Sequence, residues 1–67
     1  MYKNNMKILR ENKGISLSDL SKQSGISVGY LCHLERGTRK NPSISVMDKI
    51  SSALNKSVSE IFFSENK

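Results

Sequence analysis

The stretch LSDLSKQSGISVGYLCHLER, residues 17–36, decides the fold of this chain. Leucines recur in it at helical spacing on both sides of a central break, as Leu31 and Leu34 do in its second half. This spacing predicts two short helices, and the tetrapeptide SGIS at 24–27 separates them. A tight turn with a glycine between two helices is typical of a helix-turn-helix, so we expect residues 17–36 to form one.

Start and stop signals extend the helical pattern over the rest of the chain. Serine begins each expected helix after the first, and its hydroxyl can accept a hydrogen bond from a backbone N–H of the first turn. Ser16 and Ser57 are each followed three residues later by an acidic residue, Asp19 and Glu60, which predicts capping boxes. Glycine or asparagine ends the first four helices. The fold class is therefore all-α, a compact five-helix domain, with helices expected over 6–13, 16–24, 27–36, 43–54 and 57–63.

The clearest amphipathic stripe lies in the fourth expected helix. Ile44, Met47, Ile50 and Leu54 follow one another at spacings of 3, 3 and 4, so we expect them to pack together on the core. The domain is expected to span 6–62, with flexible ends at 1–5 and 63–67.

Composition narrows the function classes. The chain has 67 residues, 36% of them hydrophobic, which suffices for one small core but not for a deep substrate cleft. One cysteine and one histidine can form neither an internal disulfide nor a zinc site of about four ligands. No apolar run reaches the roughly 18–20 residues of a membrane span. We therefore expect a cytoplasmic protein that is not an enzyme, with no cofactor, no metal and no membrane partner.

Positive charge is concentrated in the front of the chain. Lys and Arg outnumber Asp and Glu by 11 to 6, which gives a formal net charge of +5. Residues 1–40 hold 8 basic and 3 acidic residues, whereas residues 41–67 hold 3 of each, so the whole excess precedes Pro42. This split predicts a front half that faces phosphate and a back half that faces itself or a partner, and a solvated basic face is the alternative.

Residues at fixed positions of the stretch resemble those of the Cro and lambda-repressor-like (XRE) regulators, and most closely the Sin-type repressor branch. Six positions of the stretch hold the kind of residue that is usual in that family: four are apolar, one is small and one is glycine. They are Leu20, Ile26, Leu31, Leu34, Ser21 and Gly25. Further similar phrases are GISLSDL at 14–20, YL at 30–31, LERG at 34–37, NPSI at 41–44 and LNKSV at 54–58.

The resemblance covers about residues 6–62 and implies a function. It implies a sequence-specific regulator of transcription that binds double-stranded DNA, located in the cytoplasm at the nucleoid. A repressor acting as a homodimer on a palindromic operator is the expected form, with a protein antagonist as a further partner. The alternatives are an antitoxin or restriction-system controller with the same domain, or a protein-interaction module that uses the last two helices.

Three positions depart from the family pattern. Ser24 stands where the family usually has an apolar residue, which predicts looser packing between the two helices. Val28 and Gly29 stand where polar base-reading residues are common. Valine can touch a thymine methyl but cannot hydrogen-bond a base, and Gly29 can permit close approach of the backbone to DNA. Base reading is therefore expected to shift toward Ser27, His33 and Arg36, or toward DNA shape.

The resemblance places the second helix of the motif in the major groove. Arg36 is the strongest candidate for a base contact, because a guanidinium can bind guanine through two hydrogen bonds, although a basic residue also suits a helix C-terminus. His33 can read a base, touch a phosphate or simply be exposed. The candidate base-reading residues are Ser27, Val28, Gly29, Cys32, His33 and Arg36.

Phosphate contacts are expected from a helix N-terminus and from a basic loop. Free N–H groups at the start of a helix bind anions, and the loop after the second helix of the motif carries two cations. Tyr30 can donate to a phosphate or cover the core. The candidate phosphate-binding residues are Ser16, Leu17, Ser18, Tyr30, Thr38, Arg39, Lys40 and Asn41.

Two further pairs have structural roles. The resemblance implies a salt bridge between Arg10 of the first helix and Glu35 of the third. Phe62 and Phe63 are adjacent, so one is expected to face the core and the other outward. The outward phenylalanine is a candidate for the dimer contact, with a stray surface side chain as the alternative.

Overall fold

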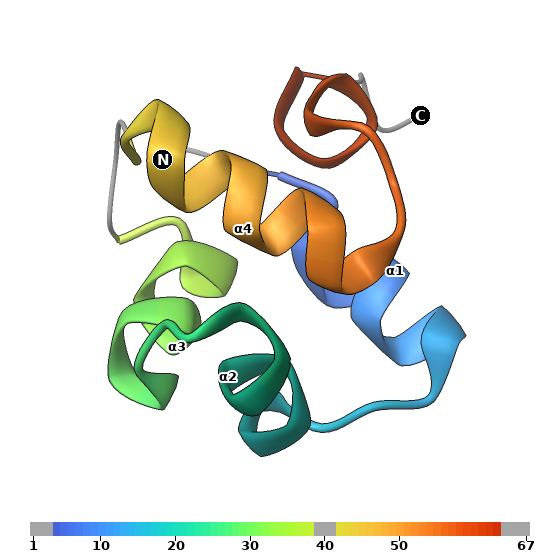
Figure 1. The fold of residues 1–67 in the computed structure, drawn as a ribbon, viewed down its shortest axis with the longest axis vertical. Coiled ribbons are helices and arrows are strands. Elements are labelled where there is room, and N and C mark those ends of the chain that lie inside the picture. Colours follow the sequence, from blue (N-terminus) through green and yellow to red (C-terminus); the bar gives the residue numbers. More distant parts are fainter. Residues whose placement is uncertain (1–3, 39–41, 64–67) are drawn as a thin grey trace.

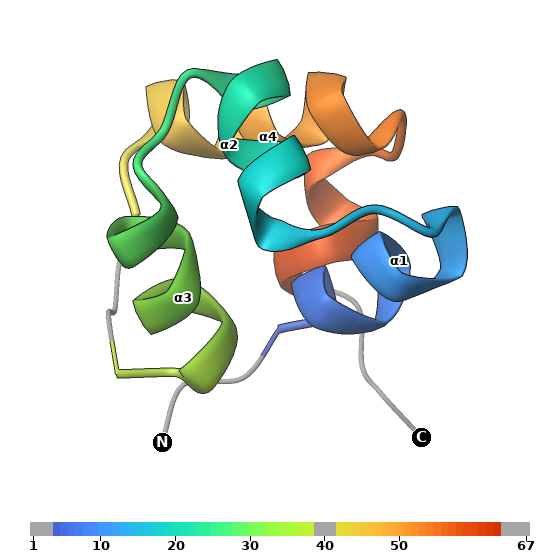
Figure 2. The same ribbon diagram turned by 90° about the horizontal axis from the view of Figure 1, so that it is seen from below.

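The computed structural model describes residues 4–38 and 42–63, and all regular structure within them is helical. The elements are α1 (Met6–Lys13), α2 (Leu17–Ser24), α3 (Val28–Arg36), α4 (Ile44–Leu54) and the π-helical turn η1 (Ser59–Phe63). In Figure 1, α2 and α3 lie side by side, and α4, which packs against α2, runs above them. Seen from below, η1 lies against α1 (Figure 2). The prediction of an all-α domain with five short helices is confirmed for the described residues.

Serine hydroxyls cap the N-termini of three helices. The hydroxyls of Ser16, Ser27 and Ser43 each accept a hydrogen bond from the backbone N–H three residues further on, at 3.0, 3.2 and 3.2 Å. Asp19 completes the first of these caps, because its carboxylate accepts a hydrogen bond from the Ser16 N–H at 3.1 Å. Each cap satisfies a backbone donor that has no partner inside its helix.

The last element is a π-helical turn rather than an α-helix. It follows the predicted capping box, in which Ser57 and Glu60 exchange hydrogen bonds of 3.0 and 3.1 Å. Ile61 and Phe62 are buried, whereas Phe63 is 66% exposed. The two phenylalanines therefore face opposite ways, as expected, and Phe62 belongs to the core.

The four α-helices end in left-handed residues at the predicted positions. Gly14, Gly25 and Gly37 have φ between 76 and 79°, and Asn55 has a φ of 57°. Glycine adopts this conformation at low cost and asparagine is its commonest substitute. The connections that begin at Gly14 and Gly25 are only three residues long, which brings the first three helices close together.

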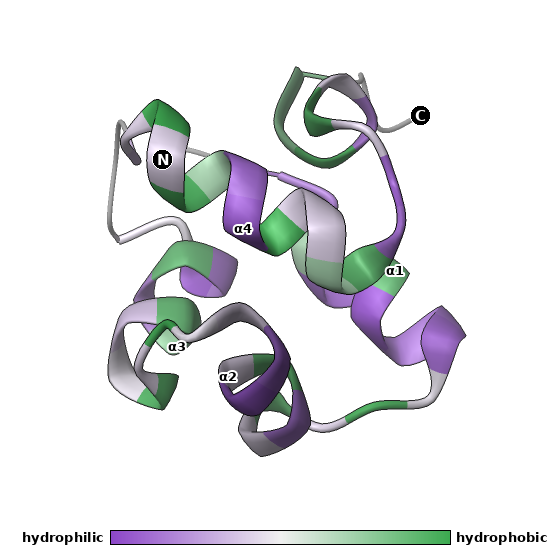
Figure 3. Cartoon of the chain, viewed as in Figure 1, coloured by the Kyte–Doolittle hydropathy of each residue, from purple (hydrophilic) through white to green (hydrophobic). Residues whose placement is uncertain are grey.

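One apolar core joins all five elements. Figure 3 shows hydrophobic and hydrophilic residues interleaved along the helices, which is the pattern of elements with one face buried. The buried hydrophobic residues are Met6, Leu20, Ile26, Leu31, Leu34, Ile50, Ala53, Leu54, Ile61 and Phe62.

The predicted stripe of α4 is wrong at its first position. Ile50 and Leu54 are buried and Met47 is partly buried, but Ile44 is 74% exposed. Ile44 is the first residue of the helix, directly after the Ser43 cap. Ala53 is also buried in the core, although it was not among the residues of the predicted stripe.

Candidate nucleic-acid interface

The turn between α2 and α3 is held by a buried serine. Ser24, the last residue of α2, is 8% exposed, and its hydroxyl accepts a hydrogen bond from the Ile26 N–H at 3.2 Å. The side chain of Ile26 points into the core, at 9% exposure. A buried hydroxyl is tolerated where it is hydrogen-bonded, which explains how this polar residue occupies a position that is apolar in the family.

The inner side of α3 is anchored, which leaves its other side uncovered. Leu31 and Leu34 are completely buried. Residues spaced by three and four share one face of a helix, so Gly29, His33 and Arg36 form one outward stripe. The structure places every predicted base-reading residue on the exposed side except Cys32, which is only partly exposed.

The N-terminal end of α3 presents one apolar residue and one glycine to the outside. Val28 is 43% exposed, and a Cβ atom built on Gly29 would meet nothing within 4 Å. The Ser27 hydroxyl is used by the Tyr30 N–H, so the N–H groups of Val28 and Gly29 remain at the open end of α3. This end of the helix therefore offers a methyl surface and two backbone donors.

The end of the stripe is ordered by a side-chain contact. His33 Nδ1 lies 2.9 Å from Thr38 Oγ1, and both residues are exposed. The Thr38 hydroxyl and the Thr38 N–H both donate to the His33 carbonyl, at 3.2 and 3.1 Å. Thr38 therefore uses both of its donors within the chain.

The start of α2 has two backbone donors available to an anion. The capping box occupies the N–H groups of Ser16 and Asp19, which leaves those of Leu17 and Ser18. The side chain of Leu17 packs against the core, whereas Ser16 and Ser18 are exposed. The hydrogen bond from the Ser16 N–H lowers the pKa of Asp19, so a carboxylate lies at this helix end as well.

The remaining phosphate candidates divide into two groups. Tyr30 is partly buried and packs against the core. Arg39, Lys40 and Asn41 lie outside the described residues.

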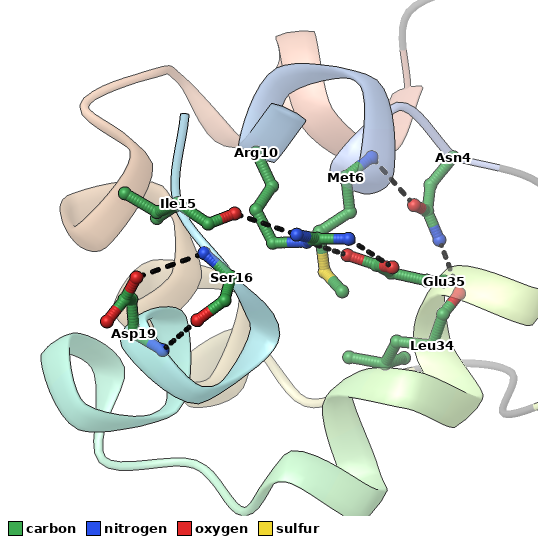
Figure 4. A network of polar contacts seen from close by, with 8 residues as sticks. All are labelled: Asn4, Met6, Arg10, Ile15, Ser16, Asp19, Leu34 and Glu35. Carbon is green, nitrogen blue, oxygen red and sulfur yellow. Dashed lines mark hydrogen bonds and ion pairs between the residues drawn. The ribbon is translucent and has the colours of Figure 1, made fainter. Parts of the chain in front are cut away.

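Arg10 ties α3 to the rest of the fold (Figure 4). Its Nε lies 2.7 Å from Glu35 Oε2, and the two side chains are only 11% and 7% exposed. A second nitrogen of Arg10 donates to the carbonyl of Ile15 at 2.7 Å, which fixes the link between α1 and α2. The hydrogen bond to Glu35 raises the pKa of Arg10. This cation of the basic front half is therefore neutralised inside the fold.

An asparagine before α1 reaches the C-terminal end of α3 (Figure 4). Asn4 donates to the carbonyl of Leu34 and accepts from the N–H of Met6, both at 2.9 Å. Sequence reasoning missed this contact, since no local pattern relates residues 30 positions apart. It also missed the contact between His33 and Thr38, although Gly37 was a signal: a left-handed residue there brings Thr38 back over the end of the helix.

The described residues give little support to other kinds of site. Among them there is no group of three His, Cys, Asp or Glu that could hold a metal ion. None of their helices combines the length and the hydrophobicity required to cross a membrane. A shallow depression of about 350 Å³ lies between the ends of α1 and α4, where Lys13 donates to the carbonyl of Ala53. None of the predicted site residues lines it.

A model of the helix-turn-helix family matches residues 6–61. The transcriptional regulator SlrR of Bacillus subtilis is 37% identical to the chain over 60 residues, which are 90% of this chain and 40% of SlrR. The regulator SinR of the same organism is 42% identical over 53 residues, which are 79% of this chain and 48% of SinR. The chain thus spans less than half the length of these relatives.

Two solved structures share the fold. The N-terminal DNA-binding domain of SinR from Bacillus subtilis superposes with a TM-score of 0.87 at 35% identity, over 94% of this chain and 91% of that domain. The restriction-modification controller protein C.AhdI from Aeromonas hydrophila superposes with a TM-score of 0.78 at 34% identity, over 84% of this chain and 83% of the controller.

Proposed function

Because the chain belongs to the Cro and lambda-repressor-like (XRE) helix-turn-helix family, we propose that it is a sequence-specific transcription regulator that binds double-stranded DNA and represses. The SinR domain with the same fold is a DNA-binding domain, which supports this function. In this proposal α3 enters the major groove, whose width of about 12 Å admits a helix.

The observation that carries the proposal is the uncovered outer side of α3. Leu31 and Leu34 of this helix are buried in the core. Gly29, His33 and Arg36 lie on the opposite, exposed side. Arg36 reads guanine in this arrangement, because its guanidinium can donate to O6 and N7 together. Val28 contacts a thymine methyl. Base reading in this proposal draws on Ser27, Val28, Gly29, Cys32, His33 and Arg36.

The DNA backbone is held on both sides of α3. The free N–H groups of Leu17 and Ser18 and the hydroxyls of Ser16 and Ser18 bind one phosphate at the start of α2. The basic loop with Arg39, Lys40 and Asn41 binds another, and Tyr30 donates to a further phosphate. Such contacts position the protein without reading sequence.

Repression follows from occlusion of a promoter by a homodimer on a palindromic operator. Two copies of α3 would then read half-sites about one helical turn apart, which is the usual arrangement for helix-turn-helix proteins. Phe63, exposed beside the buried Phe62, is the proposed dimer contact. A protein antagonist that covers this contact would release the DNA.

Selection of bound DNA from a random duplex library at about 150 mM salt tests this function. A palindromic consensus is the expected result, and its half-site spacing gives the geometry of the dimer. The variant Arg39→Ala/Lys40→Ala should lower the slope of log affinity against log salt by about 2, since each phosphate contact contributes about one. Binding without enrichment of any sequence would contradict the proposal.

A restriction-system controller is the second candidate, because the fold of C.AhdI matches over 84% of this chain. The same selection distinguishes the two functions once the operator is located. A controller's operator lies next to restriction and modification genes, whereas a general repressor's operator does not. The antitoxin and protein-interaction alternatives stay predictions of the sequence alone.

A further inference from the structure

The hydrogen bonds between His33 and Thr38 favour one arrangement of the histidine hydrogens. A carbonyl oxygen can only accept, so the hydrogen bond of 3.2 Å between Thr38 Oγ1 and the His33 carbonyl uses the single hydroxyl hydrogen of Thr38. With its hydrogen used there, Thr38 Oγ1 accepts from His33 Nδ1, which lies 2.9 Å away. The neutral ring therefore carries its hydrogen on Nδ1.

The other ring nitrogen follows from this assignment. A neutral imidazole with its hydrogen on Nδ1 presents an unprotonated Nε2, which is an acceptor. The side chain is exposed, and within the described parts of the chain no group is bonded to Nε2. The outward edge of His33 thus offers one lone pair beside Arg36, which offers only donors.

Building on the proposed function, we propose that Thr38 is a positioning residue for base recognition, which holds His33 in the tautomer whose Nε2 accepts from an exocyclic amino group in the major groove. Adenine N6 and cytosine N4 carry such groups there. The exposed atoms of guanine (O6 and N7) and of thymine (O4) are acceptors, so they cannot form a hydrogen bond with the lone pair of Nε2. His33 therefore selects adenine or cytosine at the base that it faces.

The geometry favours this role over a phosphate contact by Thr38. The N–H and the hydroxyl of Thr38 both donate to the His33 carbonyl, at 3.1 and 3.2 Å, so neither is directed to an external anion. A hydrogen bond that holds the ring in place also lowers the entropy lost when Nε2 binds a base.

The first test is NMR of the ring nitrogens in the free protein, at mildly alkaline pH where an imidazole is neutral. In the wild type, the ¹⁵N shifts should report hydrogen on Nδ1 and none on Nε2. Thr38→Val keeps the shape and the backbone N–H but removes the hydroxyl, so the ring should become a mixture of tautomers. Thr38→Ser restores the hydroxyl and should restore the wild-type shifts. A wild-type ring with hydrogen on Nε2 would overturn the inference.

The second test is DNA selection with the same variants. The wild type and Thr38→Ser should prefer adenine or cytosine at one position of each half-site. Thr38→Val should lose about fivefold of that preference, the value of one net hydrogen bond, while the other positions and the salt slope stay unchanged. His33→Ala should lose the same preference, and Thr38→Val added to it should change nothing further.

The outcomes separate this inference from the proposed function. If the wild type selects an operator and Thr38→Val keeps its base preference, base positioning by Thr38 is refuted while the regulator remains. If the wild type selects no sequence, the proposed function fails and the base-reading role fails with it. A general loss of affinity at every position in Thr38→Val would assign the residue to the helix end alone, which also refutes the inference.

Discussion

At the scale of single residues, the most costly interaction to disturb is the buried pair of Arg10 and Glu35. We expect Arg10→Met to destabilise the domain by about 3 kcal/mol, because it leaves a carboxylate buried without its partner. The carbonyl of Ile15 also loses a donor. Urea unfolding followed by circular dichroism measures the loss.

The double variant Arg10→Met/Glu35→Leu is the control for this prediction. It removes the stranded charge, so part of the lost stability should return. An Arg10→Met protein that melts at the wild-type temperature would show that the pair contributes nothing.

A second residue separates stability from binding. Gly29 lies in a helix with room for a methyl group, so Gly29→Ala should stabilise α3 by roughly 0.5–1 kcal/mol. The same methyl stands on the proposed DNA-facing side, so affinity for the selected operator should fall about tenfold through loss of close approach. Thermal unfolding and a binding titration measure the two effects.

Ser52→Ala provides the matched control, since Ser52 is exposed on α4 and not among the proposed DNA contacts. It should raise helix stability slightly and leave DNA binding unchanged. If Gly29→Ala binds as tightly as the wild type, the backbone does not approach DNA closely at this position.

At the scale of elements, the two capping boxes make stability depend on pH. The Ser16 and Ser57 N–H groups hold the pKa of Asp19 and Glu60 below their ordinary values of 3.8 and 4.5. A lowered pKa in the folded state means that the unfolded chain binds more protons, so this contribution is present at neutral pH. This contribution to the free energy of unfolding is lost as the pH falls below the ordinary pKa values toward the lowered pKa values of the folded state.

We therefore expect the urea midpoint to fall as the pH is lowered from about 6 to about 3, and to fall less in Asp19→Ala/Glu60→Ala. Asp48→Ala is the control, because Asp48 is exposed in the middle of α4 and forms no cap. It should keep the wild-type dependence. Identical curves for the wild type and the double variant would contradict the role of the boxes.

The elements also show what sequence can and cannot predict. Caps and stops are local: a serine hydroxyl accepts from the backbone N–H three residues further on, and a left-handed glycine ends the helix. The bounds of α3 could therefore be predicted closely from Ser27 and Gly37. Burial is not local. Ile44 continues the apolar spacing of α4, yet it is 74% exposed, because burial depends on packing between elements that the spacing does not encode.

The candidate site shows the same division. Family resemblance and helical spacing predicted which residues of α3 lie outward, apart from the partly exposed Cys32, because Leu31 and Leu34 fix the orientation of the helix. They were not enough to find the hydrogen bond from Asn4 to the Leu34 carbonyl, since that contact depends on how the chain before α1 returns to α3. The partners of individual polar atoms require the three-dimensional structure.

At the scale of the whole molecule, size and charge favour assembly on DNA. A net charge of +5 favours phosphate as a partner, but in the proposed complex one copy of α3 would read only a few base pairs. Pairing two copies doubles the sequence read and multiplies the affinity through effective concentration. The proposed dimer contact is therefore central to specificity, and its variants should change binding without changing the fold.

Phe63→Ser tests that contact. Phe63 is 66% exposed, so its loss should leave the free energy of unfolding within about 0.5 kcal/mol of the wild type. Sedimentation should change from a concentration-dependent dimer to a monomer, and affinity for a full palindrome should drop toward that for one half-site, by at least about 100-fold.

Ile44→Ser is the matched control, because Ile44 is an exposed apolar residue on another element. It should keep both the dimer and the affinity. If Phe63→Ser still dimerises and binds the palindrome as the wild type does, the two copies meet through another surface. The exposed Ile8 of α1 would then be the next position to replace.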